Sequence, residues 1–390
     1  MTTRQIASIL QQRLSSGVRA AVLLGPRQVR KTTLARQLAT HWPQVAVYLD
    51  LELPYDRRRL EDPETCLRAV APKLVVIDVI HRVPELFAVL RGLIDERRAA
   101  GQRYGLFLLL SSAAMEQMQQ SSETLAGRVA HLDKHATNLR EAISTGLSES
   151  VLWNRGGFPD SLLAQDAAHS MACRQDFIRS YLERDMPMFA LRMPAETLGR
   201  LWTMLAHQES GQINQAQLGA SLGVSALSVD HYLHLLTDLH LVRRRQPWLA
   251  NEGKRLVKTP KVLLRDSGLG HALLGLKNEN DVLGHPVAGA RYQGFVLETT
   301  ITQADPSLKP ISIERTMVHI LTCFLNAAGN PISRLRSNGP VRHPPSGGSN
   351  TRVTIWASAN ASCLPGYRKF QHATRRKGHW LARHARIAEP

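Results

Sequence analysis

Residues 18 to about 135 alternate short apolar runs with segments whose apolar positions repeat at helical spacing. The short runs are apolar throughout, which is typical of strands that are buried on both faces of a parallel sheet. Leu86, Val89, Leu90, Leu93 and Ile94 instead recur on one face of a helix. This alternation predicts an α/β fold with a parallel sheet. We expect strands at residues 20–24, 45–49, 74–77, 106–110 and 129–132, and helices at residues 33–40 and 84–98.

The pattern between about residues 150 and 300 is mostly helical. Residues 216–225 predict a helix that ends in a tight turn at Gly223, and residues 229–239 predict a second helix. An extended basic segment, Leu241 to Trp248, follows. This order resembles a winged helix-turn-helix.

Apolar periodicity fades beyond about residue 300, and the charge changes there. Residues 315–390 hold twelve Lys or Arg and one acid, so they supply +11 of the net charge of +17. One interpretation is a basic arm that binds nucleic acid. The other, which we favour, is translation in a shifted reading frame, because the segment is rich in Arg, Pro, Ser and Gly and periodic in nothing. Glu314 and Glu389 are its only acids after Asp305, which excludes a metal site built from these residues.

The composition of the chain indicates in which cellular compartment the protein is found. The apolar fraction of 43% is ordinary, and no run of apolar residues is long enough to span a membrane. The N-terminus lacks the apolar core of a signal peptide. The cysteines form neither a CxxC pair nor a zinc-binding spacing, so we expect reduced thiols and a cytoplasmic location. They are Cys66, Cys173, Cys323 and Cys363.

The segment from Gly25 to Thr33 follows an apolar strand and precedes a helix, as a phosphate-binding loop does. Main-chain amides of such a loop bind phosphate oxygens, the Lys31 ammonium would reach the β- and γ-phosphates, and the Thr32 hydroxyl would ligate Mg²⁺. Arg30 stands where GxxxxGK[ST] has its second glycine. A side chain there costs roughly 1–3 kcal/mol of backbone strain. The candidate ATP-binding residues are Gly25, Pro26, Arg27, Gln28, Val29, Arg30, Lys31, Thr32 and Thr33.

A second motif follows in the predicted strand at residues 74–77, whose four apolar residues end at Asp78. Ligands of open α/β sheets bind at the carboxyl ends of the strands, so Asp78 would lie beside the phosphate-binding loop. Its carboxylate and Thr32 would hold the Mg²⁺ ion. Both motifs together predict ATP and Mg²⁺ as the ligands.

These motifs, in this order, resemble a family of bacterial and archaeal AAA-type ATPases that carry a C-terminal domain of unknown function. The resemblance runs from about residue 5 to about residue 300. It implies an α/β, P-loop NTPase domain of the AAA type at residues 1–140. A mostly helical domain with a winged helix would follow at residues 150–300, and then an irregular basic tail at residues 301–390. The matching segments are residues 25–28, 31–33, 48–52, 83–87, 110–113, 122–128, 181–185, 248–251, 254–258 and 266–269.

The resemblance also implies roles for single residues. Asp78 would be catalytic, and Ser112, or its neighbour Ser111, would contact the γ-phosphate. Arg128 would act as an arginine finger on a neighbouring subunit of a homo-oligomer. An alternative for Arg128 is a surface residue in a turn.

Three positions depart from the family pattern. Arg30 stands where the family has Gly, and Val79 stands where it has the Glu that polarises the attacking water. His81 stands where the family usually has Gln. Valine cannot accept a proton, so we expect weak ATP binding and impaired hydrolysis. His81 is a candidate base, although a lone histidine is more often structural.

A different class of function is a DNA-binding regulator with a relic nucleotide fold. Ser225, Ser228 and His231 would then read bases. The basic residues on phosphates would be Arg243, Arg244, Arg245, Lys254 and Arg255. The second helix has two acids and no Lys or Arg, which weakens this reading. The same unit could equally be a packing module that transmits motion of the ATPase domain.

Overall fold

The computed structural model describes residues 5–102, 104–112, 125, 127–186, 194–245 and 260–303. The chain divides into two units, Met1–Thr302 and Gln303–Pro390, and every described element begins in the first. The predictions for the basic tail, for Lys254 and Arg255, and for Cys323 and Cys363 lie outside the described residues.

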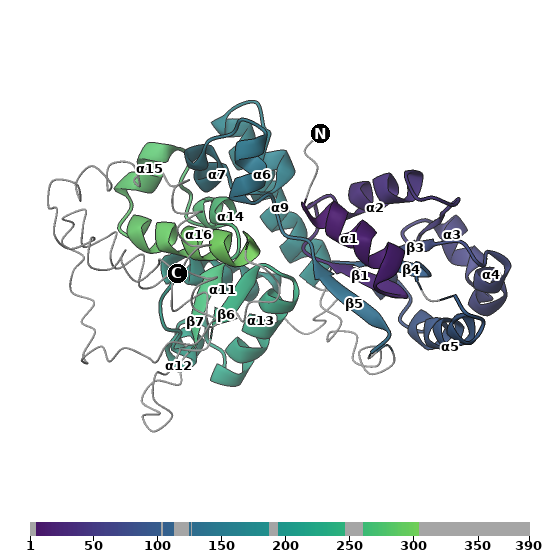
Figure 1. Ribbon diagram of the computed structural model, residues 1–390. Coiled ribbons are helices and arrows are strands. Elements are labelled where there is room, and N and C mark those ends of the chain that lie inside the picture. The colour runs from purple at the N-terminus through teal and green to yellow at the C-terminus, as the bar shows by residue number, and fades with distance from the viewer. Residues whose placement is uncertain are drawn as a thin grey trace, which may run out of the picture. The chain divides into compact units, whose positions relative to one another are not determined.

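A five-stranded parallel sheet has the order β2-β3-β4-β1-β5 (Figure 1). Strands β1, β3 and β4 are buried along their whole length, as their unbroken apolar runs predicted. The predicted parallel α/β sheet is therefore confirmed, with each strand within two residues of its predicted bounds. The strands are β1 (Ala20–Leu24), β2 (Val47–Asp50), β3 (Val75–Asp78), β4 (Phe107–Ser111) and β5 (Val129–Asp133).

Helices cover both faces of this sheet (Figure 1). On one face, Leu14 and Leu34 pack with Leu23. On the other, Leu90 and Ile94 pack with strand residues such as Val22. Neighbouring side chains of a strand point to opposite faces, so a strand with helices on both sides must be apolar at every position. The helices are α1 (Gln5–Ser16), α2 (Lys31–Thr40), α3 (Pro54–Arg59), α4 (Pro63–Ala69), η1 (Ile80–Arg82) and α5 (Leu86–Ala99).

Residues 139–303 are mostly helical, as predicted, and pack around a core that includes Trp202, Leu205 and Leu233. The first helices of this region are α6 (Leu139–Ser144), α7 (Glu149–Arg155), α8 (Pro159–Leu162), α9 (Ala167–Ser180), η3 (Tyr181–Asp185) and α11 (Ala195–His207). They are followed by α12 (Gln215–Leu222), α13 (Ala226–Asp238), α14 (Ser267–Leu273), α15 (Glu279–Gly284) and α16 (Ala288–Gln303).

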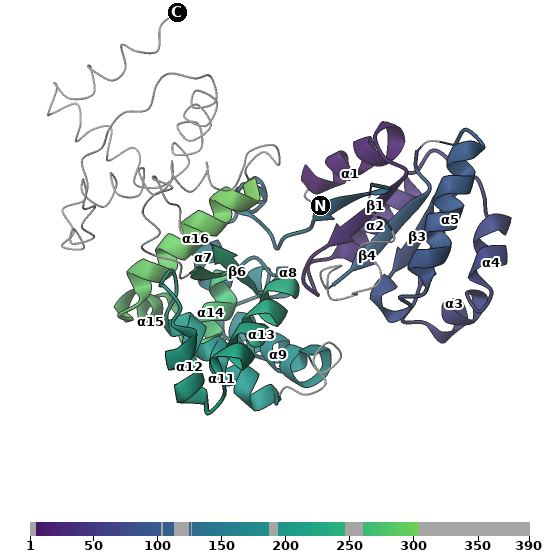
Figure 2. The ribbon, with the colours of Figure 1, turned by 90° about the horizontal axis from the view of Figure 1, so that it is seen from below.

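Helices α12 and α13 lie side by side and are joined at Gly223, whose φ of 70° is left-handed (Figure 2). This reproduces the predicted helix, turn and second helix. Strand β6 (Val242–Arg245) follows and pairs antiparallel with β7 (Lys261–Leu264). The rest of the predicted basic segment, residues 246–248, lies outside the described residues, and the winged-helix assignment stays a prediction.

No helix in the described part of the chain is both long enough and apolar enough to cross a membrane. Cys66 and Cys173, the cysteines in this part, are free.

Candidate functional site

The loop at residues 25–30 joins the buried strand β1 to helix α2. Gly25 has a φ of 151°, and a Cβ at this position would collide with the carbonyl oxygen of Lys134. The Lys134 amide in turn donates to the Leu24 carbonyl over 2.6 Å. The first glycine of the predicted motif is therefore required by the close approach of the segment that follows β5.

Arg30 adopts the left-handed conformation that the motif reserves for glycine. It precedes helix α2 with φ 63° and ψ 42°. Gln28, two positions earlier, has a φ of 62°. The left-handed conformation costs an L-residue roughly 1–2 kcal/mol, so this loop holds strain at two of its six positions. The Arg30 side chain extends to Asp160, with 3.9 Å between the guanidinium and the carboxylate.

Lys31 turns its side chain back onto the loop. Its Nζ donates to the carbonyl oxygens of Gly25 and Pro26, each over 2.7 Å. Burial lowers the pKa of this ammonium to about 7, with Asp78 opposing the shift and Arg27 adding to it. A phosphate group that replaced the two carbonyls would bring negative charge, which favours the protonated form.

Thr32 and Asp78, the predicted Mg²⁺ ligands, lie in contact. The Thr32 hydroxyl donates to Asp78 Oδ2 over 2.7 Å, and the Tyr48 hydroxyl donates to the same oxygen over 2.7 Å. Burial, followed by the Asp78 charge, raises the pKa of Tyr48. Among the described residues no three His, Cys, Asp or Glu side chains form a metal site. A Mg²⁺ ion held by Thr32 and Asp78 would take phosphate oxygens and water as the other ligands of its octahedral shell.

Val79 follows Asp78 and is also left-handed, with φ 59° and ψ 40°. A β-branched residue is strongly disfavoured there. The turn starts η1, which carries His81, and the Ser111 hydroxyl lies 3.4 Å from His81 Nδ1. Burial, with the charges of Arg27, Lys31 and Arg82, lowers the pKa of His81 to about 4. The imidazole is therefore neutral at pH 7.

A cavity of about 250 Å³ joins these groups. This is close to the lower end of the range of small-molecule sites, roughly 300–1,000 Å³. Asp160, from α8, also lines it. Gly25, Pro26, Val29 and Thr33 are not among its lining residues. The predicted site residues that line it are Arg27, Gln28, Arg30, Lys31, Thr32, Asp78, Ser112 and, as the alternative to Ser112, Ser111.

Arg128 lies away from this cavity, engaged with a carboxylate of its own chain. Its Nε and Nη2 donate to Oδ1 and Oδ2 of Asp95 on α5, over 3.0 and 2.8 Å. Such a two-pronged pair has a fixed geometry. Arg128 could reach a neighbouring subunit only after leaving Asp95.

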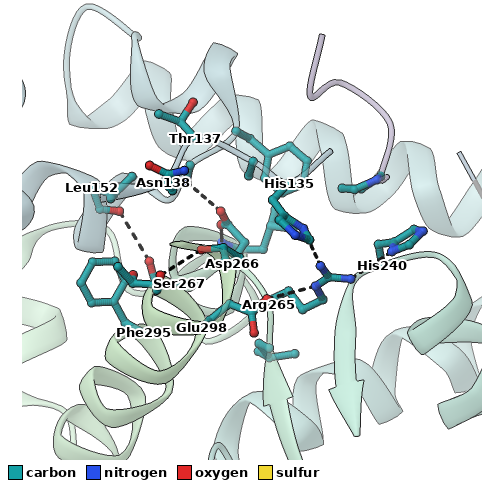
Figure 3. Close-up of a pocket in the computed structure, with 18 of the residues that line it drawn as sticks. His135, Thr137, Asn138, Leu152, His240, Arg265, Asp266, Ser267, Phe295 and Glu298 are labelled. Atoms are coloured by element: carbon teal, nitrogen blue, oxygen red, sulfur yellow. Dashed lines mark hydrogen bonds and ion pairs between the residues drawn. The ribbon is translucent and has the colours of Figure 1, made fainter. Parts of the chain in front are cut away.

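A second, smaller cavity of about 60 Å³ has Arg265 and Glu298 in its lining, and these two side chains belong to a network of hydrogen bonds and ion pairs (Figure 3). Arg265 donates to Nδ1 of His135 over 2.7 Å and to Nδ1 of His240 over 2.9 Å. Its Nε donates to Glu298 over 3.1 Å, and Arg243 donates twice to Glu298 over 2.7 Å each. A cavity of this size holds only a few water molecules. The sequence analysis did not identify this network, because its members are scattered over more than 160 residues.

Two of the basic residues that the DNA-binding alternative invokes are paired with carboxylates of the same chain. Arg243 is held by Glu298, and Arg244 donates to Asp230 over 2.9 Å. Ser225 accepts from the Ser228 amide over 3.0 Å, so it caps helix α13. His231 is exposed.

Comparisons with known proteins match both the sheet region and the helical region of the chain. The model of a family described as "AAA domain" matches residues 18–143, and that of a "Domain of unknown function (DUF8612)" matches residues 150–280. The uncharacterized protein Rv2008c of Mycobacterium tuberculosis is 38% identical over 311 residues, which are 80% of this chain and 68% of that protein. The uncharacterized protein Mb2031c of Mycobacterium bovis matches with the same values.

One of the solved structures that the chain is similar to is the Walker-type ATPase PABY2304 of Pyrococcus abyssi. It is 11% identical, and the match covers 70% of this chain and 96% of that chain. The TM-score is 0.47.

Proposed function

Because the chain belongs to the family of AAA domain proteins, we propose that it binds ATP with Mg²⁺ and hydrolyses it slowly. The observation that carries this proposal is the convergence of Lys31, Thr32 and Asp78 on one cavity. The two motifs lie 46 positions apart, yet the Thr32 hydroxyl and the Asp78 carboxylate are 2.7 Å apart.

The residues suit a triphosphate. Helix α2 begins at Lys31, so its first amides and its dipole favour an anion beside the loop. Lys31 would exchange its two carbonyl partners for phosphate oxygens. Thr32 and Asp78 would hold Mg²⁺, which would neutralise charge on the phosphates. Ser111 and Ser112 line the cavity at the end of β4, where either hydroxyl would contact the γ-phosphate.

Slow hydrolysis follows from what the site lacks. Val79 occupies the position after Asp78 and has no group that accepts a proton from water. Arg128, which we propose as the finger toward a neighbouring copy of this chain, is paired with Asp95. Asp78, Ser112 and Arg128 would therefore support nucleotide binding and assembly better than they support turnover.

A binding assay tests the first half of the proposal. A fluorescent ATP analogue is titrated with Mg²⁺ into the wild type, Lys31→Ala and Lys73→Ala. Lys73 is the matched control, because it is an exposed lysine before the amino end of β3, at the opposite edge of the sheet. We expect binding in the wild type and the control, and a loss of at least tenfold in Lys31→Ala. Absence of binding in all three proteins rules the proposal out.

The DNA-binding alternative has less support, because Arg243 and Arg244 already neutralise carboxylates of the same chain. It is tested by salt-dependent DNA binding of the chain without residues 302–390. Binding that persists after this deletion, and weakens when Arg243, Arg244 and Arg245 are changed to Ala, would favour the alternative.

A further inference from the structure

A tyrosine of the helical region is hydrogen bonded to the phosphate-binding loop. The Arg27 amide donates to the Tyr181 hydroxyl over 2.9 Å, although the two residues are 154 positions apart. The Tyr181 side chain is 1% exposed. The Tyr181 end of this contact is therefore buried, and burial strengthens a hydrogen bond relative to one at the surface.

The loop makes a second, apolar contact with the same region. Val29 is fully buried and belongs to the hydrophobic cluster that contains Phe158, Phe177 and Tyr181. In this cluster the ring centroids of Phe177 and Tyr181 are 4.6 Å apart, and those of Phe158 and Phe177 are 4.5 Å apart. The loop thus buries a valine side chain in the hydrophobic core of the helical region.

These two contacts alternate with the strained positions of the loop. Arg27 and Val29 are the anchored residues, whereas Gln28 and Arg30 carry the left-handed backbone conformation. Strained backbone persists only where the surrounding structure holds it in place. A loop that lacks its second glycine needs such support more than one that has it.

The backbone that presents Tyr181 is itself unusual. Helix α9 ends at Ser180, and a π-helical turn, η3, runs from Tyr181 to Asp185. Turns of this kind are rare and frequent at functional sites. A wider turn shifts the following side chains around the helix axis.

We propose that Tyr181 is a positioning residue for the phosphate site. It holds the Arg27 amide, and with Val29 it keeps the loop in its phosphate-binding conformation. This inference rests on the proposed function, because the ligand is the triphosphate of that site. By linkage, a nucleotide that favours this loop conformation also favours the contact with Tyr181.

Tyr181→Phe tests the inference in the full-length protein, since it removes the hydroxyl and keeps the ring. Tyr292→Phe is the matched control. Tyr292 is another tyrosine of the helical region, and its hydroxyl donates to Glu149 over 2.6 Å. With Mg²⁺ and a fluorescent ATP analogue, we expect roughly three- to tenfold weaker binding in Tyr181→Phe, the size of one hydrogen bond. We expect less than a twofold change in Tyr292→Phe. Equal affinities in both variants, or tighter binding in Tyr181→Phe, would overturn the inference.

A second measurement needs no nucleotide. Amide hydrogen exchange of a peptide covering residues 25–31 should be faster in Tyr181→Phe than in the wild type, and unchanged in Tyr292→Phe. Unchanged exchange in Tyr181→Phe would mean that the hydroxyl does not hold the loop. If the wild type binds no nucleotide, the proposed function fails, and the exchange rates alone decide whether Tyr181 positions the loop.

Discussion

Thr32 and Asp78 share a hydrogen bond of 2.7 Å that joins the start of α2 to the end of β3. Asp78 Oδ2 accepts a second hydrogen bond from Tyr48, so two hydroxyl groups orient one carboxylate. The orientation is set before any ligand arrives.

Asp78→Asn should remove the Mg²⁺ dependence of nucleotide binding. An amide keeps the size of the side chain and loses the charge that attracts Mg²⁺. We expect the affinity of the wild type for a fluorescent ATP analogue to rise at least tenfold when Mg²⁺ replaces EDTA, and that of Asp78→Asn to rise less than twofold. Asp62→Asn is the control, since Asp62 caps α4 away from the cavity. Equal Mg²⁺ dependence in all three proteins would exclude Asp78 as the metal ligand.

Arg30→Gly should stabilise the protein by up to about 1 kcal/mol. Glycine removes roughly 1–2 kcal/mol of left-handed strain, and its larger unfolded-state entropy offsets part of this gain. Arg30→Ala separates the backbone from the charge, because it keeps the strain and loses the contact with Asp160. Urea denaturation measures the free energy of unfolding of both variants and of the wild type. A glycine variant no more stable than the alanine variant would argue against strain at this position.

Val79→Glu should raise ATP turnover by at least tenfold over the wild type. Val79 lines the cavity, and a carboxylate there could orient water and accept its proton. Val79→Gln is the control, since it has the size of Glu and little basicity. Release of radiolabelled phosphate measures the rates. A wild type that already turns over at about 1 s⁻¹ or faster would refute impaired hydrolysis.

Nucleotide affinity should fall as the pH rises above 7. Burial lowers the pKa of Lys31 to about 7 in the unliganded protein, and phosphate binds the ammonium form. Binding above pH 7 therefore requires proton uptake, and the affinity falls by up to about tenfold per pH unit. Lys31→Arg keeps its charge and should show a flatter profile between pH 7 and 9. The measurement is the dissociation constant of the nucleotide for the wild type and for Lys31→Arg at each pH. If both proteins show the same pH dependence, the titrating group is not Lys31.

The fold was predictable where the chain repeats a simple physical pattern. Continuous apolar runs such as Leu106 to Leu110 leave a strand no face that tolerates water, so the parallel sheet follows from the sequence alone. Part of the site was predictable for the same reason, because the ends of β1 and β3 meet at one edge of the sheet. This places Lys31 beside Asp78 without any knowledge of tertiary structure.

The rest of the site depends on contacts that no local pattern encodes. Tyr48 and Tyr181 reach the site from 30 and 154 positions away from their partners. Both stood in segments that family resemblance had marked, but nothing in the residues assigned them a partner. Arg128 shows the opposite limit: the sequence gives its charge, and only the fold pairs it with Asp95.

The position of Arg265 fixes the ring chemistry of two histidines. A guanidinium group only donates, so Nδ1 of His135 and of His240 must each offer a lone pair, and both rings carry their proton on Nε2. Burial, together with the Arg265 charge, lowers the pKa of both imidazoles. At low pH a second proton would bind to Nδ1 of each ring, where it would face the Arg265 guanidinium and repel it. The segments that follow β5, α13 and β7 share this one arginine, so protonation of the two rings would weaken the contacts that join them.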